Sequence, residues 1–170
     1  MVAAWLWWPS ASDTDSDAAP ETSAAAPPNN PDQTRLQALL PTGYTEDACR
    51  PADPSAGALA ALECDRNGDT GGPTTATYVL VDAAKDIDAV LDSLIADLDV
   101  VVCPGNIQSP GPWRRNADPN SVAGTLVCAS RGTQNVVAWT TETSNLVSVA
   151  YGEGADPSLG DLYRWWTTHS

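Results

Sequence analysis

The sequence predicts an α+β domain, built as an antiparallel sheet with helices packed on one face and two disulfide bonds. Short runs rich in Val, Thr, Leu and aromatic residues recur between turn-forming segments, which is typical of strands. Residues 82–98 instead repeat their apolar side chains with helical spacing. The 4 cysteines lie in two close pairs, Cys49 with Cys64 and Cys103 with Cys128.

The first residues precede the folded part. Residues 1–8 form an apolar, tryptophan-rich stub, much shorter than the about 20 residues that span a bilayer. Because tryptophan concentrates at membrane interfaces, we interpret this stub as the end of a truncated membrane segment, or else as an unstructured apolar terminus. Residues 9–31 are rich in Pro, Ala, Ser and Asp, which predicts a disordered acidic linker. The folded domain is expected over residues 32–170, an arrangement that fits an N-terminal membrane tether.

The first half of the domain is expected to open with a short helix that Asp32 caps and Pro41 ends. Residues 57–64 predict a first strand and residues 75–81 a second. Asp82 is expected to cap the best helix of the chain, whose apolar stripe comprises Ile87, Val90, Leu91, Leu94, Ile95 and Leu98.

The second half repeats this outline. A short buried run is expected at residues 100–103, followed by a loop over residues 104–119. A last helix is expected from Asp156 and Pro157, a capping residue followed by proline at the first helical position. Each half then contains a cysteine-bearing strand, a glycine-containing loop and an Asp-capped helix, which predicts two similar half-units. The strands expected in the second half cover residues 124–129, 135–141 and 146–151.

The cysteine spacing favours disulfides over a metal site. Zinc sites usually draw on CxxC pairs, and this sequence has none. Structural disulfides persist in oxidising compartments, so the cysteines predict an extracytoplasmic protein. Four cysteines allow three pairings, and joining nearest neighbours closes two short loops, each contributing roughly 3 kcal/mol of stability.

The charge and the scarcity of histidine exclude several functions. The net charge of −14, from 22 acidic and 8 basic residues, argues against nucleic-acid binding, which depends on clustered Lys and Arg. The one histidine, His169, is next to the last residue, where chains usually fray, so a Ser-His-Asp triad is not expected. We therefore expect a non-enzymatic protein without a cofactor. A secreted hydrolase that uses carboxylates alone is one alternative.

Asp65, Asn67 and Asp69 have the alternate spacing of a calcium-binding loop. The full pattern also needs Gly at position six and Glu at position twelve, where this sequence has Thr70 and Ala76. A turn rich in Asp, Asn and Gly explains the three residues equally well. Calcium is therefore an alternative interpretation rather than the expected one.

Trp113, Arg114 and Arg115 form a basic and aromatic segment within an acidic chain. Because the sequence has no Phe, tryptophan must supply much of the aromatic core. Trp139, on an expected strand, and the helical pair at 165 and 166 are expected to pack in or beside that core. Trp113 is the best candidate for an exposed ring, and two guanidinium groups beside it suit an anionic or sugar ligand. We assign residues 113–115 to a candidate ligand-binding site; the alternative is that they close the loop onto the acids of the helix.

Landmarks for a family resemblance extend from residue 36 to residue 168. They are Leu39-Leu-Pro-Thr-Gly-Tyr44, Ala48-Cys49, Ala58-Leu-Ala-Ala-Leu-Glu-Cys64, Gly71-Gly-Pro-Thr-Thr-Ala-Thr-Tyr78, Cys103-Pro-Gly105, Ala123-Gly-Thr-Leu-Val-Cys128, Trp139-Thr140 and Leu162-Tyr-Arg-Trp-Trp166. Together they resemble the C-terminal extracytoplasmic, sensor-like domain of actinobacterial, especially mycobacterial, serine/threonine protein kinases and of related stand-alone exported proteins. The resemblance implies an external module that follows a transmembrane helix. It carries no kinase activity, because the chain has none of the kinase Gly-rich, His-Arg-Asp or Asp-Phe-Gly motifs.

We predict a membrane-tethered or secreted sensor or ligand-binding module with the pairing Cys49–Cys64 and Cys103–Cys128. Its partner is expected to be an unidentified cell-envelope ligand or protein. A structural envelope protein that acts by protein contact is the main alternative. A deep pocket lined by Trp113 and Arg114 would favour ligand binding, and a flat apolar patch would favour protein contact.

Overall fold

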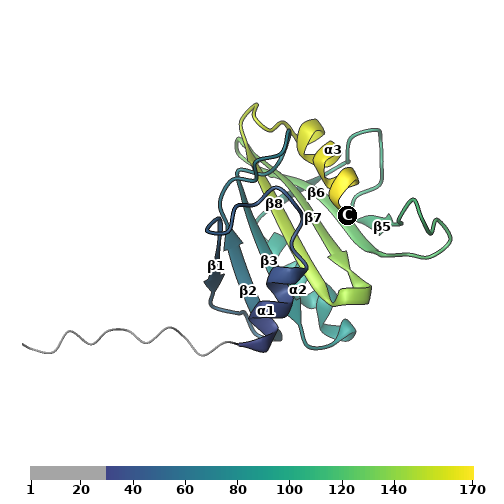
Figure 1. Cartoon of the computed structure of the whole chain (residues 1–170). Helices are drawn as coiled ribbons and strands as arrows, with labels where there is room; N and C mark the ends of the chain where they lie inside the picture. The colour runs from purple at the N-terminus through teal and green to yellow at the C-terminus, as the bar shows by residue number, and fades with distance from the viewer. Residues whose placement is uncertain (1–29) are drawn as a thin grey trace, which may run out of the picture.

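The computed structural model describes residues 30–170, which form one eight-stranded sheet with three α-helices (Figure 1). The helices are α1 (Pro31–Ala38), α2 (Ile87–Ile95) and α3 (Leu159–His169). The strands are β1 (Cys49–Ala52), β2 (Ala58–Cys64), β3 (Thr75–Val81), β4 (Asp99–Val101), β5 (Gly111–Trp113), β6 (Gly124–Arg131), β7 (Gln134–Thr141) and β8 (Leu146–Glu153). The predicted α+β class is confirmed. The expected stub at 1–8 and nearly all of the expected linker lie outside the described residues.

The sheet joins two antiparallel meanders in the order β1-β2-β3-β8-β7-β6-β4. Every strand pair is antiparallel, and the meanders meet where β3 pairs with β8. Strands β4 and β5 lie one after the other along the same edge of β6, so they form one interrupted edge strand. The expected likeness of two half-units is not confirmed, because the first meander has no counterpart of this interrupted edge.

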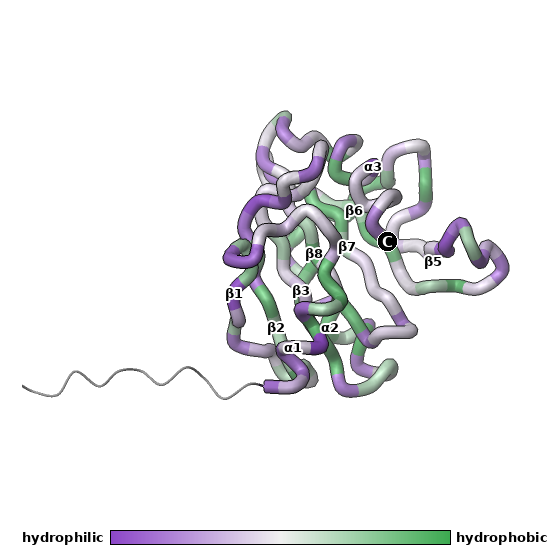
Figure 2. Tube along the Cα trace, viewed as in Figure 1, coloured by the Kyte–Doolittle hydropathy of each residue, from purple (hydrophilic) through white to green (hydrophobic). Residues whose placement is uncertain are grey.

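The helices cover both faces of the sheet, which corrects the expectation that they share one face. Helices α1 and α3 pack on one face, in a core that includes Leu36, Leu62 and Trp165. Helix α2 packs on the other face, where Val90 and Leu91 contact a valine-rich layer. The physical reason is that the central strands bury both sets of alternating side chains, and Figure 2 shows hydrophobic residues concentrated along them. A sheet that is apolar on both faces needs a helix on each.

The helices begin at residues other than the predicted caps. The N-cap of α1 is Asn30, whose Oδ1 accepts a hydrogen bond from the Asp32 backbone N–H at 3.0 Å. Ser158 caps α3 through its hydroxyl, so the helix begins after Pro157 rather than with it. Helix α2 follows a short 3₁₀ turn (Ala84–Asp86) that separates it from Asp82. Asn and Ser cap helices as well as Asp does, so several neighbouring residues compete for the role.

Strands β1 and β5 are absent from the sequence prediction, because their sequences Cys-Arg-Pro-Ala and Gly-Pro-Trp contain proline and few strand-forming residues. Both lie at sheet edges, where proline is tolerated because one side of the strand needs no ladder hydrogen bond. The run at 100–103 is not uniformly buried. Val100 is 44% exposed and Val102 is 62% exposed, since β4 is also an edge.

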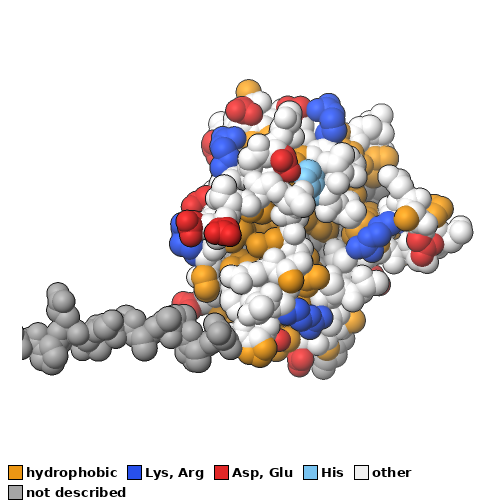
Figure 3. All heavy atoms as spheres, viewed as in Figure 1, with side chains coloured by type: hydrophobic (Ala, Val, Ile, Leu, Met, Phe, Trp, Pro, Cys, Tyr) orange, Lys and Arg blue, Asp and Glu red, His pale blue; other side chains and the backbone are white. Residues whose placement is uncertain are grey.

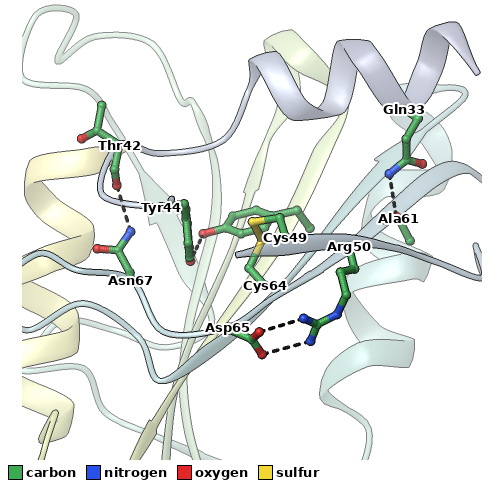
Figure 4. Close-up of a disulfide and its surroundings, with 10 residues drawn as sticks. Gln33, Thr42, Tyr44, Cys49, Arg50, Ala61, Cys64, Asp65 and Asn67 are labelled. Atoms are coloured by element: carbon green, nitrogen blue, oxygen red, sulfur yellow. Dashed lines mark hydrogen bonds and ion pairs between the residues drawn. A yellow bond between two sulfur atoms is a disulfide. The ribbon is translucent and has the colours of Figure 1, made fainter. Parts of the chain in front are cut away.

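Both predicted disulfides are present, Cys49–Cys64 and Cys103–Cys128 (Figure 4 shows the first). Cys49 lies directly opposite Cys64 on the edge pair β1–β2. Cys103 lies just after β4 and bonds to Cys128 on β6, at the opposite edge of the sheet. The register runs from Cys64 to Cys128 through Ala76, Ala150 and Val137, so the two disulfides lie in one row across the sheet.

Two disulfides of this kind place the protein in an oxidising, extracytoplasmic environment. Over residues 30–170, no helix is long and apolar enough to cross a membrane.

Candidate functional site

Trp113 is buried, which corrects the expectation of an exposed ring. Only 5% of its surface is exposed. Its indole Nε1 donates a hydrogen bond to the Thr140 carbonyl oxygen at 2.8 Å, and its ring packs edge-to-face on Trp166 at 5.6 Å. The sequence could not show this, because Trp113 is buried by α3, which lies some fifty residues further along the chain. Trp139, Trp165 and Trp166 are buried as predicted.

The two arginines of the predicted site lie beside a hollow next to Trp113. The Arg115 guanidinium carbon lies 5.2 Å from the centroid of the Trp113 ring, so the cation stacks on the indole face. Arg114 is exposed and Arg115 is half-buried. Together with Trp113, Tyr163 and Trp166, both arginines line a hollow of about 260 Å³, which we call the outer hollow. The structure thus brings all three predicted residues around one cavity.

A second hollow of about 140 Å³, the inner hollow, lies over the centre of the sheet between α1 and α3. Its lining comprises Leu39, Pro41, Tyr78, Arg115, Trp139, Thr141, Ser144, Leu146, Ser148, His169 and Ser170. Figure 3 shows hydrophobic side chains gathered in this depression, with basic side chains on the side of β5. Arg115 lines both hollows, so the two adjoin at its guanidinium group.

Ser148 explains why the inner hollow exists. The strand register places Leu62, Tyr78, Ser148, Trp139 and Leu126 in one row across the sheet. Directly paired residues point to the same face, so this row forms the floor beneath α1 and α3. Ser148 is the smallest side chain of the row and stands between two aromatic rings. A large apolar residue there would fill the space.

The Ser148 hydroxyl has no hydrogen-bond partner among the described residues, although the residue is fully buried. The Nε1 of Trp166, in the wall of the outer hollow, is likewise buried without a partner. Buried polar groups are normally paired, because leaving one unpaired costs on the order of 1–3 kcal/mol. Thr140 shows the normal case nearby, since its Oγ1 accepts a hydrogen bond from the Thr125 N–H at 2.8 Å. Each hollow therefore has an unused polar group in its wall.

His169 is fixed rather than frayed, which corrects the sequence expectation. Its ring stacks on Trp165 at 4.7 Å, and its Nε2 lies 2.9 Å from Asp69 Oδ2. Its Nδ1 lies 2.8 Å from the Trp165 carbonyl oxygen. Both ring nitrogens are thus occupied, and neither is placed to take a proton from Ser148. The histidine forms part of the wall of the inner hollow.

Tyr78 and Tyr44 share a hydrogen bond at the α1 end of the inner hollow, with 2.9 Å between their hydroxyl oxygens (Figure 4 labels Tyr44). Burial raises the pKa of Tyr44 to about 12. Burial also raises the pKa of Tyr78 well above its ordinary value. Both phenols are therefore neutral at physiological pH and present hydrogen-bonding, uncharged groups.

The residues with calcium-loop spacing have structural partners. Asp65 accepts two hydrogen bonds from Arg50, and Asn67 is buried, donating to the Thr42 carbonyl oxygen and accepting from the Asp69 N–H. Over residues 30–170, no three His, Cys, Asp or Glu side chains gather in a way that could hold a metal ion. The geometry is that of an Asx turn.

Carboxylates line a different hollow, of about 430 Å³, beside the start of α3. Asp156 and Asp161 belong to it. The Asp161 carboxylate accepts hydrogen bonds from Ser158 Oγ at 2.6 Å and from Arg164 at 2.8 Å, and these bonds lower its pKa. A carboxylate held ionised in this way is unsuited to act as the general acid of a glycosidase.

Neither protein-family models, nor curated proteins, nor solved structures match this chain. The likeness to the external domains of actinobacterial kinases stays a prediction from sequence.

The sequence also contains one signal for the site that the sequence analysis did not use. Ser148 is a polar residue at an inward position of an otherwise apolar strand run. Its meaning depends on the neighbouring strands, which the sequence does not reveal.

Proposed function

We propose that this protein is a non-enzymatic, extracytoplasmic ligand-binding or sensor module whose ligand enters the cleft formed by the two hollows. The observation that carries the proposal is Ser148, whose buried, unpaired hydroxyl lies in the floor of the inner hollow beside Tyr78 and Trp139. Ligand sites are typically concave and mostly apolar, with a few polar groups that orient the ligand. The cleft combines apolar and aromatic residues with polar groups that include the Ser148 hydroxyl and the Arg115 guanidinium group.

The position of the cleft supports a role in sensing a ligand. It lies between α1 and α3, whose ends are both part of its wall. Helix α1 is the first described element, directly after residues 1–29. In the proposed tethered arrangement, a ligand that draws α1 and α3 together acts on the segment that leads toward the membrane. The likeness to external kinase domains supports the same arrangement.

A binding screen with the full chain tests the proposal. Muropeptides, glycans and small aromatic compounds are titrated by calorimetry against the wild type, Leu39→Trp and Ser148→Leu. Both substitutions occupy space in the inner hollow, so each is expected to lower the affinity of a cleft ligand at least tenfold. Ser121→Leu, which adds the same side chain in an exposed loop, is expected to bind like the wild type.

The proposal is wrong if nothing binds, or if the bound compounds ignore Leu39→Trp while the variant keeps its wild-type circular dichroism. The alternative of a protein-contact module would then gain weight. Exposed Val100 and Val102 on and beside edge strand β4 favour that alternative.

A further inference from the structure

The walls of the cleft differ in charge from the rest of the molecule. The chain carries 22 acidic residues, yet no Asp or Glu lines either the inner or the outer hollow. By contrast, a hollow beside Tyr44 includes Glu46, and the hollow at the start of α3 includes Asp156 and Asp161. The cleft instead contains Arg114, Arg115 and His169. The absence of Asp and Glu side chains from this cleft, in an otherwise acidic protein, favours an anion over a cation.

Arg115 is the group that an anion would meet at the junction of the hollows. Among the described residues it has no carboxylate within salt-bridge distance, whereas Arg50 and Arg164 are paired with Asp65 and Asp161. The guanidinium group lies over the Trp113 ring, and this contact holds it at the junction of the two hollows. A guanidinium edge matches the two oxygens of a carboxylate.

The inner hollow has the size and lining for one aromatic ring. Cavities of about 150 Å³ with apolar walls take a benzene-sized group. Tyr78 and Trp139 pack edge-to-face at 6.4 Å beside it, and Leu39 and Leu146 complete the apolar wall. Edge-to-face contacts with such rings favour an aromatic guest. The floor also contains the unpaired Ser148 hydroxyl.

We infer that the cleft binds a small aromatic carboxylate, with the ring in the inner hollow over Ser148 and the carboxylate on Arg115. This inference rests on the proposed function, because it names the ligand class of the same cleft. A polar ring substituent on the side away from the carboxylate is expected to reach Ser148.

Three matched probes test the inference by calorimetry with the full chain. 4-Hydroxyphenylacetate carries both polar groups, 4-hydroxyphenylacetamide lacks the charge, and phenylacetate lacks the hydroxyl. The acid is expected to bind at least tenfold more tightly than the amide, because a hydrogen bond to a charged group is stronger than one between neutral groups. Arg115→Gln is expected to reduce the preference for the acid over the amide to less than about twofold, because it removes the charge that distinguishes the two probes. Arg66 is an exposed arginine outside both hollows. Arg66→Gln makes the same charge change and is expected to keep the preference for the acid over the amide.

Ser148→Ala separates the polar contact from the charge. It is expected to weaken 4-hydroxyphenylacetate several-fold more than phenylacetate. If acid and amide bind equally, or if Arg115→Gln leaves the preference intact, the ligand class is wrong although the cleft binds. If none of the three probes binds, the ligand class is also wrong, and the broader screen with Leu39→Trp decides separately whether the cleft binds anything.

Discussion

Single buried residues account for the cleft and for much of its chemistry. Ser148 stands where the row from Leu62 to Leu126 would otherwise be continuous. Ser109 is a contrasting serine, because its Oγ accepts from the Cys128 N–H at 2.8 Å and donates to the Cys128 carbonyl oxygen at 3.2 Å. Its hydroxyl thereby takes the place of a backbone hydrogen-bond partner of Cys128 in the gap between β4 and β5. The Ser109 hydroxyl therefore stabilises the fold, whereas the Ser148 hydroxyl has no hydrogen-bond partner.

The same substitution at these two serines is expected to have different effects. Ser148→Ala should raise the free energy of unfolding by up to about 1–3 kcal/mol, because it removes a buried hydroxyl that has no hydrogen-bond partner. Ser109→Ala should cost about 1–3 kcal/mol, because it leaves the buried Cys128 N–H unpaired. Urea unfolding followed by tryptophan fluorescence measures both. A loss above about 1 kcal/mol for Ser148→Ala would mean that its hydroxyl has a structural partner.

The buried tyrosine pair predicts a loss of stability in alkali. Tyr44 ionises near pH 10 in the unfolded chain but at about 12 in the folded one. Between these pH values the unfolded state loses its proton first. The contribution of this pKa difference to the free energy of unfolding is therefore fully present below pH 10. It falls as the pH rises toward 12, by about 2 kcal/mol for Tyr44 alone. Unfolding midpoints in urea at pH 8, 10.5 and 11.5 measure this decline, which should be shallower in Tyr44→Phe. An equal slope in the variant would contradict the assignment.

At the scale of elements, patterns in the sequence predict long strands and fail for short ones. The predicted ranges 57–64 and 75–81 match β2 and β3 within one residue. The strands β1 and β5 exist because β2 and β6 offer them a paired edge, and no local pattern reveals that. The candidate site divides in the same way. Residues 113–115 are consecutive, so the sequence alone predicts them as candidates, whereas Tyr78, Trp139 and Ser148 come from three strands that only the sheet brings together.

Two glycines in regular elements predict opposite effects of alanine. A Cβ on Gly124, at the start of β6, would clash with the Thr140 carbonyl oxygen. Because that atom is backbone, Gly124→Ala should cost about 3 kcal/mol or more of stability. Gly160, in the first turn of α3, has no atom closer than 3.8 Å to such a Cβ. Gly160→Ala should gain about 0.5 kcal/mol, because alanine loses less backbone entropy in a helix. Thermal unfolding ranks the variants, and a midpoint of Gly124→Ala at or above the wild type would refute the close packing of β6 on β7.

At the scale of the whole molecule, the order of strands makes the sheet apolar on both faces and closes both its edges with a disulfide. The sequence predicted the pairing of the cysteines but not that Cys64 and Cys128 share one row. That fact requires the pairing of β3 with β8, a contact between residues about seventy positions apart. The same contact places Ser148 beside Tyr78 and creates the inner hollow. The alignment of the two disulfides and the cleft therefore both result from the pairing of β3 with β8.

The two disulfides are expected to stabilise the fold independently. They close loops with separations of 15 and 25 residues that do not overlap in sequence, so each restricts a different part of the unfolded chain. In the folded state β3, β8 and β7 lie between β2 and β6, so no side chain contacts both of the strands that carry Cys64 and Cys128. Replacing either cysteine pair by alanine should cost about 3 kcal/mol, slightly more for Cys103 with Cys128. Replacing both pairs should cost the sum within about 0.5 kcal/mol. Urea unfolding of the four proteins measures this cycle, with trimethylamine N-oxide added to keep the quadruple variant folded. A coupling above about 1 kcal/mol would show that the edges of the sheet communicate through its central strands, and the cleft over Ser148 would then lie on that route.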